Sequence, residues 1–208
     1  MAKATLVIGT PNLSSWSLRP WLLMRQLEIS FEEVLIELDR PTSKAEILRH
    51  SPAGRVPVLK EGGLAIWESL AIIEYLAERS PELEVWPRDR AARAEARSLS
   101  AEMHSGFAAL RDELPLEVTA RRPGTTYSAD AAADIARIVE CWEAVLARHR
   151  GGGGFLFGAF SAADAMFAPV VSRFITYDVP LGNAAAGYRD LIWNLSAMAE
   201  WRAKAGEA

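Results

Sequence analysis

A polar loop near the start of the chain combines hydroxyl side chains with the expected beginning of a helix. Its sequence is Asn12-Leu13-Ser14-Ser15-Trp16-Ser17, between an apolar run at 5–9 and a helical pattern. In open α/β sheets, ligands lie at such strand-to-helix junctions. The helix terminus offers free N–H groups and a partial positive charge, which favour an anion such as a thiolate. Serines here also serve as N-caps, and at least one of the three is expected to do only that.

Two later segments have features that suit a peptide-like ligand. Val56-Pro57 follows Gly54 and opens an apolar strand. A cis proline there would leave the N–H and C=O of Val56 free to pair with an extended peptide, whereas an ordinary trans proline would simply start the strand. At the start of a helix, Glu68-Ser69 offers a carboxylate for an ammonium group and a hydroxyl with free N–H groups for a carboxylate. The alternative for this pair is a helix cap with a favourable acid.

The first part of the chain has the pattern of a small mixed sheet with helices. Short β-branched runs predict strands, spacing of three and four predicts helices, and Gly62-Gly63 predicts a tight turn. In chain order these are a strand at 5–9, a helix at 18–27, a strand at 32–38, a short helix capped by Ser43, strands at 56–60 and 64–67, and a helix from Glu68-Ser69 to about 79. The order β-α-β followed by β-β-α predicts helices packed on a mixed sheet.

The rest of the chain has helical spacing only. Residues 80–89 contain two prolines and no periodicity, so we expect a linker between a domain at 1–79 and an all-helical domain at 90–208. Within the second domain, Ser161 and Asp164 have the spacing of a capping box. Four helices are expected, at 90–114, at 128–150, from Ser161 onward, and at 188–202.

Composition excludes several classes of protein. The single cysteine, Cys141, rules out an internal disulfide framework and a Cys-x-x-Cys redox pair, and no metal site is expected. A formal net charge of −4 gives no general attraction to nucleic acid or to an anionic membrane. No apolar run reaches the ~20 residues of a membrane span, and the first residues lack a secretory leader, so a cytoplasmic protein is expected. A Gly-x-Ser-x-Gly elbow is also missing, which disfavours a serine hydrolase.

These segments together resemble a soluble glutathione S-transferase over nearly the whole chain. The resemblance is carried by Ser14-Ser15-Trp16-Ser17-Leu18-Arg19, by Ser51-Pro52-Ala53-Gly54-Arg55-Val56-Pro57-Val58-Leu59, by Trp67-Glu68-Ser69-Leu70-Ala71-Ile72-Ile73-Glu74-Tyr75-Leu76 and by Gly158-Ala159-Phe160-Ser161-Ala162-Ala163-Asp164. The serine loop and residues 101–111 are most similar to the serine-dependent zeta class, which includes maleylacetoacetate isomerases. The chain departs from that class at Trp16, where cysteine is usual, and at Glu68, where glutamine is usual.

The resemblance implies a thioredoxin-like first domain that binds glutathione as co-substrate and a helical second domain that completes a site for a small apolar electrophile. It implies that Ser14 donates a hydrogen bond to the glutathione sulfur, with Ser15 as the second choice. It also implies a homodimer and a role in detoxification. The implied glutathione-binding residues are Arg55, Val56, a cis Pro57, Glu68 and Ser69, and the implied electrophile site comprises Trp16, His104 and Arg111.

Two other functions fit the same residues. One is a glutathione-dependent cis-trans isomerase of the maleylacetoacetate isomerase kind, which would regenerate glutathione in every turnover. The other is a non-catalytic binding protein that uses the same fold, because a fold does not fix a function. A binding protein would leave the thiol of bound glutathione un-ionised at neutral pH.

Overall fold

The computed structural model describes residues 3–207, so residues 1, 2 and 208, at the outer ends of the two expected domains, lie outside the described residues. A four-stranded mixed sheet in the order β2-β1-β3-β4 forms the centre of the first domain. β1 runs parallel to β2 and antiparallel to β3, and β3 pairs with β4 as a hairpin. The strands are β1 (Thr5–Gly9), β2 (Glu32–Ile36), β3 (Val58–Glu61) and β4 (Leu64–Trp67).

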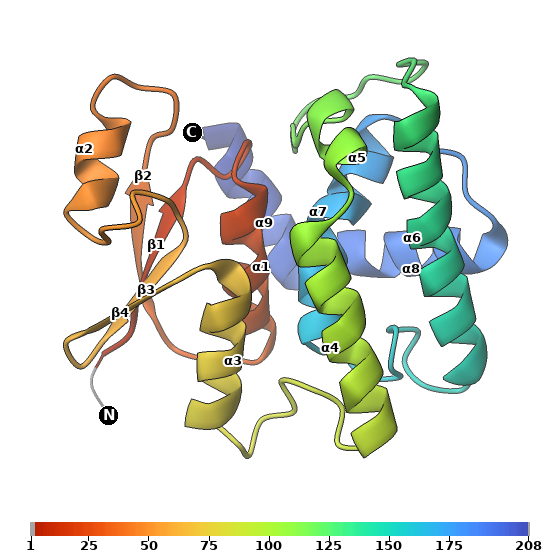
Figure 1. Cartoon of the computed structure of the whole chain (residues 1–208), viewed down its shortest axis with the longest axis horizontal. Coiled ribbons are helices and arrows are strands. Elements are labelled where there is room, and N and C mark those ends of the chain that lie inside the picture. Colours follow the sequence, from red (N-terminus) through yellow and green to blue (C-terminus); the bar gives the residue numbers. More distant parts are fainter. Residues whose placement is uncertain (1–2, 208) are drawn as a thin grey trace.

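Helices cover both faces of this sheet (Figure 1). Alternation along β1 sends Leu6 and Ile8 into the large core shared with α1 and α3, while Val7 points to the opposite face. There Val7 packs with Val58 of β3 and with Ile47 of α2. The sheet is therefore buried on two sides, as the β-α-β and β-β-α order predicts. The three helices are α1 (Ser15–Gln26), α2 (Ser43–Leu48) and α3 (Ser69–Arg79).

The second domain is helical, and α7 lies at its centre. Every residue of α7 except Ile175 is buried. Trp142 of α6 sits among three aromatic rings at centroid distances of 4.8–5.7 Å, which gives this core specific packing. None of the helices within residues 3–207 is both long and apolar enough to cross a membrane. The helices are α4 (Arg90–Ser105), α5 (Ala108–Glu113), α6 (Ala129–Arg148), α7 (Ala162–Thr176), α8 (Asn183–Trp193) and α9 (Ser196–Glu207).

The structure corrects the predicted helix at 90–114. It breaks into α4 and α5 at Gly106, where the chain turns and Phe107 takes a left-handed conformation with φ of 59°. Arg111 holds the turn, because its guanidinium donates to the carbonyl oxygens of Gly106 at 3.0 Å and of His104 at 3.4 Å. The helical spacing of apolar residues continues across this break, which is why one helix was predicted. Gly106 was the local sequence signal for the break.

Two smaller predictions are also corrected. The pattern at 188–202 is two helices, α8 and α9, separated at Asn194, and the first begins five residues earlier than expected. Ser43 does not cap α2, because Thr42 occupies the cap position. The Ser43 hydroxyl instead donates to the carbonyl oxygen of Glu37 at 2.6 Å and so anchors α2 to the end of β2.

The two domains meet along α1. The rings of Trp21 in α1 and Trp201 in α9 lie 4.9 Å apart, and both side chains are fully buried. The Trp201 indole N–H donates to the carbonyl oxygen of Pro11 at 3.1 Å, and the Thr119 N–H donates to the Asn12 side-chain oxygen at 3.0 Å. The helical domain thus holds the loop that leads into α1.

A buried capping box starts α7. The fully buried Asp164 carboxylate accepts the Ser161 N–H at 2.9 Å, the Ser161 hydroxyl at 3.2 Å and the Leu156 N–H at 3.1 Å. Burial raises the pKa of Asp164 to about 6, against the opposing effect of these hydrogen bonds. The predicted capping role of Ser161 and Asp164 is confirmed, and the carboxylate also secures the segment before the helix.

We expect Asp164→Ala to lower the free energy of unfolding by about 2–4 kcal/mol, because it removes a cap and leaves buried N–H groups unpaired. Because burial raises the pKa of Asp164, its stabilising effect is greatest at low pH and declines as pH rises through about 6. Urea denaturation at several pH values measures both effects. Asp89→Ala, which removes the exposed cap of α4, serves as a control with a smaller loss. Equal losses in the two variants would contradict the interpretation.

Candidate functional site

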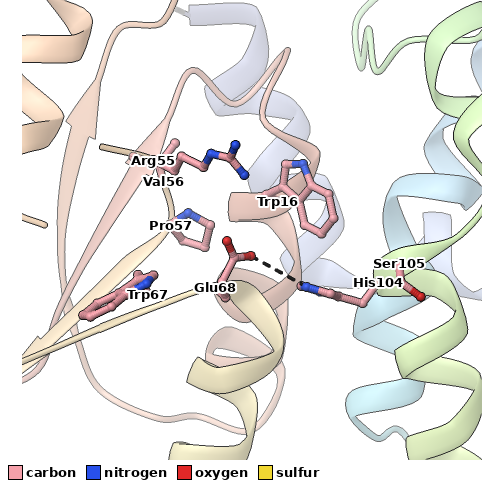
Figure 2. Close-up of a pocket in the computed structure, with 8 residues that line it drawn as sticks. All are labelled: Trp16, Arg55, Val56, Pro57, Trp67, Glu68, His104 and Ser105. Atoms are coloured by element: carbon pink, nitrogen blue, oxygen red, sulfur yellow. Dashed lines mark ion pairs between the residues drawn. The ribbon is translucent and has the colours of Figure 1, made fainter. Parts of the chain in front are cut away.

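A pocket of about 340 Å³ opens where the first domain faces α4. Figure 2 shows its side chains converging from both domains, with Glu68 between Pro57 and His104. The first domain supplies most of the wall from three segments that are far apart in sequence. The lining residues are Trp16 of α1, Arg55, Val56 and Pro57 before β3, Trp67 of β4, Glu68 before α3, and His104 and Ser105 of α4.

The segment before β3 presents backbone to the pocket. The Val56-Pro57 peptide bond is cis. Pairing between β3 and β4 begins only at Val58, opposite Trp67, so the backbone of Val56 lies outside the sheet ladder. Gly54 precedes it with φ of 59°, and a side chain there would collide with Lys44, whose ammonium group donates to the Gly54 carbonyl at 3.1 Å. The loop therefore offers free backbone groups beside a fixed turn.

Glu68 is positioned by an unusual backbone. It is the N-cap of α3 with φ of 71°, a conformation that non-glycine residues rarely adopt and that is typical of functional sites. Its side chain makes no capping hydrogen bond and is 46% exposed. Next to it, the Ser69 hydroxyl is fully buried without a hydrogen-bond partner among the described residues. A free carboxylate thus stands beside the amino end of a helix.

The serine loop ends at the start of α1. Ser14 is the N-cap, and its Oγ accepts the Ser17 N–H at 3.4 Å and hydrogen-bonds to the Ser17 Oγ at 2.7 Å. The Ser17 Oγ also accepts the Gly9 N–H at 3.1 Å, which ties the helix start to β1. Ser15 is the first residue of the helix and is buried. Both Ser14 and Ser15 lie beside Trp16, but neither is among the residues that line the pocket.

His104 faces Glu68 across the gap between the domains. Its Nε2 lies 3.7 Å from the Glu68 carboxylate, and its ring meets the Trp16 ring edge-on at 5.1 Å. Burial lowers the pKa of His104, and the cations Arg19 and Arg111 lower it further, against the opposing effect of Glu68. His104 is therefore uncharged at neutral pH. A neutral imidazole holds a carboxylate weakly, so Glu68 stays available to a cationic group.

Trp16 forms the wall nearest the serine loop, and two arginines pack on it. The guanidinium carbon of Arg19 lies 4.2 Å from the ring centroid and that of Arg111 lies 4.8 Å from it. Arg111 itself does not line the pocket. Because it also holds the turn between α4 and α5, Arg111 fixes the positions of Trp16 and His104 relative to each other.

The structure brings together most of the predicted site residues. The predicted residues that line the pocket are Trp16, Arg55, Val56, Pro57, Glu68 and His104. The predicted residues that do not line it are Ser14, Ser15, Ser69 and Arg111. From the sequence, Trp67 is expected as a core residue or as part of a cleft wall. In the structure it lines the pocket and its side chain is 43% exposed. Sequence reasoning missed Ser105, for which no sequence signal existed. Within residues 3–207, no group of three or more His, Cys, Asp or Glu side chains is placed to hold a metal ion.

Comparison with known proteins decides the family. The model of the glutathione S-transferase N-terminal domain matches residues 13–79, and that of the C-terminal domain matches residues 90–205. The chain belongs to the glutathione S-transferase family. The predicted resemblance is thus confirmed, and so is the fold class of a thioredoxin-like domain followed by a helical one.

Relatives within the glutathione S-transferase family include both transferases and isomerases. The chain is 35% identical over 98 residues to a probable maleylacetoacetate isomerase of Caenorhabditis elegans. The matched segment covers 47% of this chain and 45% of that protein. It is 26% identical over 146 residues to glutathione S-transferase hmp2 of Hypomyces subiculosus, covering 64% and 67% of the two chains. The chain thus spans less than half the length of the first of these relatives.

Solved structures share the fold over the whole chain. A glutathione transferase homolog from Burkholderia gl BGR1 with bound glutathione has a TM-score of 0.76 at 24% identity, covering 99% of this chain and 100% of that one. Glutathione transferase E6 from Drosophila melanogaster has a TM-score of 0.71 at 21% identity, covering 99% and 93%. At these identities the likeness establishes the fold of the chain.

The charges around His104 lead to a testable prediction. We expect His104 to titrate below its ordinary value of 6.5, and Glu68→Gln to lower its pKa further, because the variant removes the anion that favours the imidazolium. The imidazole proton resonances followed by NMR against pH measure this pKa. Glu74→Gln is the matched control, since Glu74 pairs with Arg97 outside the pocket. A pKa that rises or stays constant in Glu68→Gln would refute the electrostatic account.

Proposed function

We propose that this chain is a glutathione transferase that ionises the thiol of glutathione for attack on a small apolar electrophile. The supporting observation is the pocket itself, in which the backbone of Val56 outside the sheet ladder, the Glu68 carboxylate beside the uncharged His104, and Trp16 in the first turn of α1 surround one space. From the family we also infer a cytoplasmic homodimer that acts in detoxification, with the domains at 1–79 and 90–208 joined by the linker 80–89.

The first domain supplies complementary groups for the tripeptide. The extended backbone of glutathione would pair with the N–H and C=O of Val56, as an added strand does. At the γ-glutamyl end, the ammonium group would lie on Glu68, and the carboxylate would lie at the amino end of α3 near Ser69. Arg55 is exposed at the rim of the pocket and suits a carboxylate of the ligand. In this proposal one molecule of glutathione uses all three segments.

The hydroxyl pair of Ser14 and Ser17 suits stabilisation of a thiolate. Either hydroxyl can donate or accept. In the structure the Ser14 hydroxyl donates to the Ser17 Oγ, which also accepts the Gly9 N–H. If both hydroxyls turn when glutathione binds, the Ser17 hydroxyl donates to Ser14 and the Ser14 proton is free for the sulfur. Lowering a thiol pKa from about 8.5 by two units requires ~2.7 kcal/mol. A hydrogen bond to a charged acceptor supplies about 1.5–3 kcal/mol and a helix terminus about 0.3–2 kcal/mol.

The second domain would complete the electrophile site. His104 of α4, which is uncharged, faces Trp16 and Trp67 of the first domain, and together they give the pocket aromatic surface next to the expected place of the sulfur. Such a surface suits an apolar electrophile held close to the thiolate, and proximity of the two reactants is a large part of catalysis.

A second candidate function is favoured by the names of the relatives. Besides the nematode protein, the maleylacetoacetate isomerase of Rattus norvegicus is 32% identical over 99 residues. An isomerase of this kind adds the thiolate to a double bond and releases it again, so the free thiol concentration stays constant during turnover. A conjugating enzyme consumes one thiol per product. Thiol titration during incubation with maleylacetoacetate, and separately with an apolar aryl halide, distinguishes the two functions, and no turnover of either would indicate a binding protein.

We expect Ser14→Ala to reduce the conjugation rate about 10- to 100-fold with little change in glutathione affinity, because the lost hydrogen bond favours thiolate over thiol. Steady-state kinetics and calorimetry measure the two quantities. Ser15→Ala is the matched control, one residue further along α1. If Ser15→Ala loses the activity and Ser14→Ala keeps it, the sulfur partner is Ser15. Full activity in both variants would reject a serine mechanism.

A further inference from the structure

Arg19 is a buried cation directly behind the pocket. It lies in α1, four residues after Ser15 and three after Trp16, so it shares their side of the helix. Its side chain is fully buried, and its guanidinium packs on the Trp16 ring that lines the pocket. One aromatic ring therefore separates this cation from the space proposed for the ligand.

The guanidinium of Arg19 has no protein partner. None of its three nitrogens has a hydrogen-bond acceptor among the described residues. Arg173 in the neighbouring α7 is different, because it is also buried but its Nε donates to the Leu114 carbonyl at 2.8 Å and its Nη1 to the Pro169 carbonyl at 3.4 Å. An unpaired buried charge lowers the stability of the folded state, so a contribution to stability does not explain why Arg19 is buried here.

The charges around Arg19 are mostly of the same sign. Burial lowers the pKa of Arg19, and Arg111 and Arg173 lower it further, against the opposing effect of Glu68. A guanidinium nevertheless keeps its proton at neutral pH. Among the described residues, Glu68 is the one anion that offsets this charge, and the ammonium group of bound glutathione would engage Glu68. The region behind Trp16 then holds an excess of positive charge.

We propose that Arg19 is a positioning residue whose fixed positive charge favours the ionised over the neutral thiol of glutathione at the start of α1. The inference rests on the proposed function, because it takes the sulfur to lie near Ser14. Arg19 lies five positions after Ser14, which corresponds to about 7–8 Å along a helix axis. A charge that is shielded from solvent acts over this distance with little screening. Arg19 thus supplements the hydroxyl and the helix terminus without touching the ligand.

The alternative is that Arg19 only supports Trp16 through the cation–π contact. In that case its loss would change stability and packing but would leave the ionisation of the thiol unchanged. The pKa of the thiol in bound glutathione therefore separates the two roles. It is measured from the ultraviolet absorbance of the thiolate as a function of pH, with glutathione in saturating amount.

The experiment compares wild type with Arg19→Met, which removes the charge, and Arg19→Lys, which keeps it. In Arg19→Met we expect the thiol pKa to rise by about one unit, so that about ten times less thiolate is present at pH values below the wild-type pKa. In Arg19→Lys we expect the thiol pKa to stay near the wild-type value. Arg173→Met is the matched control, since it removes an equally buried but hydrogen-bonded arginine. We expect it to reduce the melting temperature and to leave the thiol pKa near that of wild type.

The other outcomes are equally specific. An unchanged thiol pKa in folded Arg19→Met, or an equal rise in Arg173→Met, would overturn the inference while leaving the proposed function intact. If wild type itself binds no glutathione by calorimetry, the proposed function fails and the inference fails with it. Should Arg19→Met not fold, Arg19→Gln removes the charge while keeping polar groups and provides the same comparison.

Discussion

The start of α1 is held from both sides, and the site depends on this constraint. From the sheet, the Gly9 N–H donates to Ser17. From the helical domain, Trp201 donates to the carbonyl of Pro11, and Thr119 donates to Asn12. A helix terminus contributes to ligand binding only while its free N–H groups keep a fixed direction. The contacts between the domains therefore determine the geometry of a terminus whose residues all come from the first domain.

The position of α7 between other helices explains why nearly all of its residues are buried. α7 packs against both α1 and α4, so it is surrounded by helices that carry pocket residues. A buried helix needs its free terminal groups satisfied from within the protein, and Asp164 does this at the start of α7. A change in α7 would be transmitted to Trp16 through α1 and to His104 through α4. The helical domain thus acts on the site mainly by positioning.

Sequence reasoning was most accurate where function and local backbone rules coincide. The strands, the hairpin at Gly62-Gly63 and the capping box at Asp164 each follow from residues close in sequence, and the structure contains all of them. The cis bond before Pro57 is also present, but only the family resemblance implied it. The break at Gly106 was missed because apolar spacing continues through it. Arg111 holds the turn locally, and Asp134 of α6, which is 24 residues from Leu110, accepts the Leu110 N–H at the start of α5. Elements held by distant residues are not encoded in local spacing.

For the site, most residues that line the pocket were predictable and the buried cation behind them was not. Val56, Pro57 and Glu68 stand at strand and helix ends, where free backbone groups mark a ligand site in advance. Arg19 ends the serine motif that carries the resemblance, but its burial was not expected, because in the sequence a helical arginine is most simply solvent-exposed. Only the structure places it behind Trp16 without a partner. Where this chain has tryptophan in place of the usual zeta-class cysteine, the larger ring both covers the cation and lines the pocket. Trp16 therefore contacts the buried Arg19 guanidinium with its ring and also forms part of the surface that a ligand would touch.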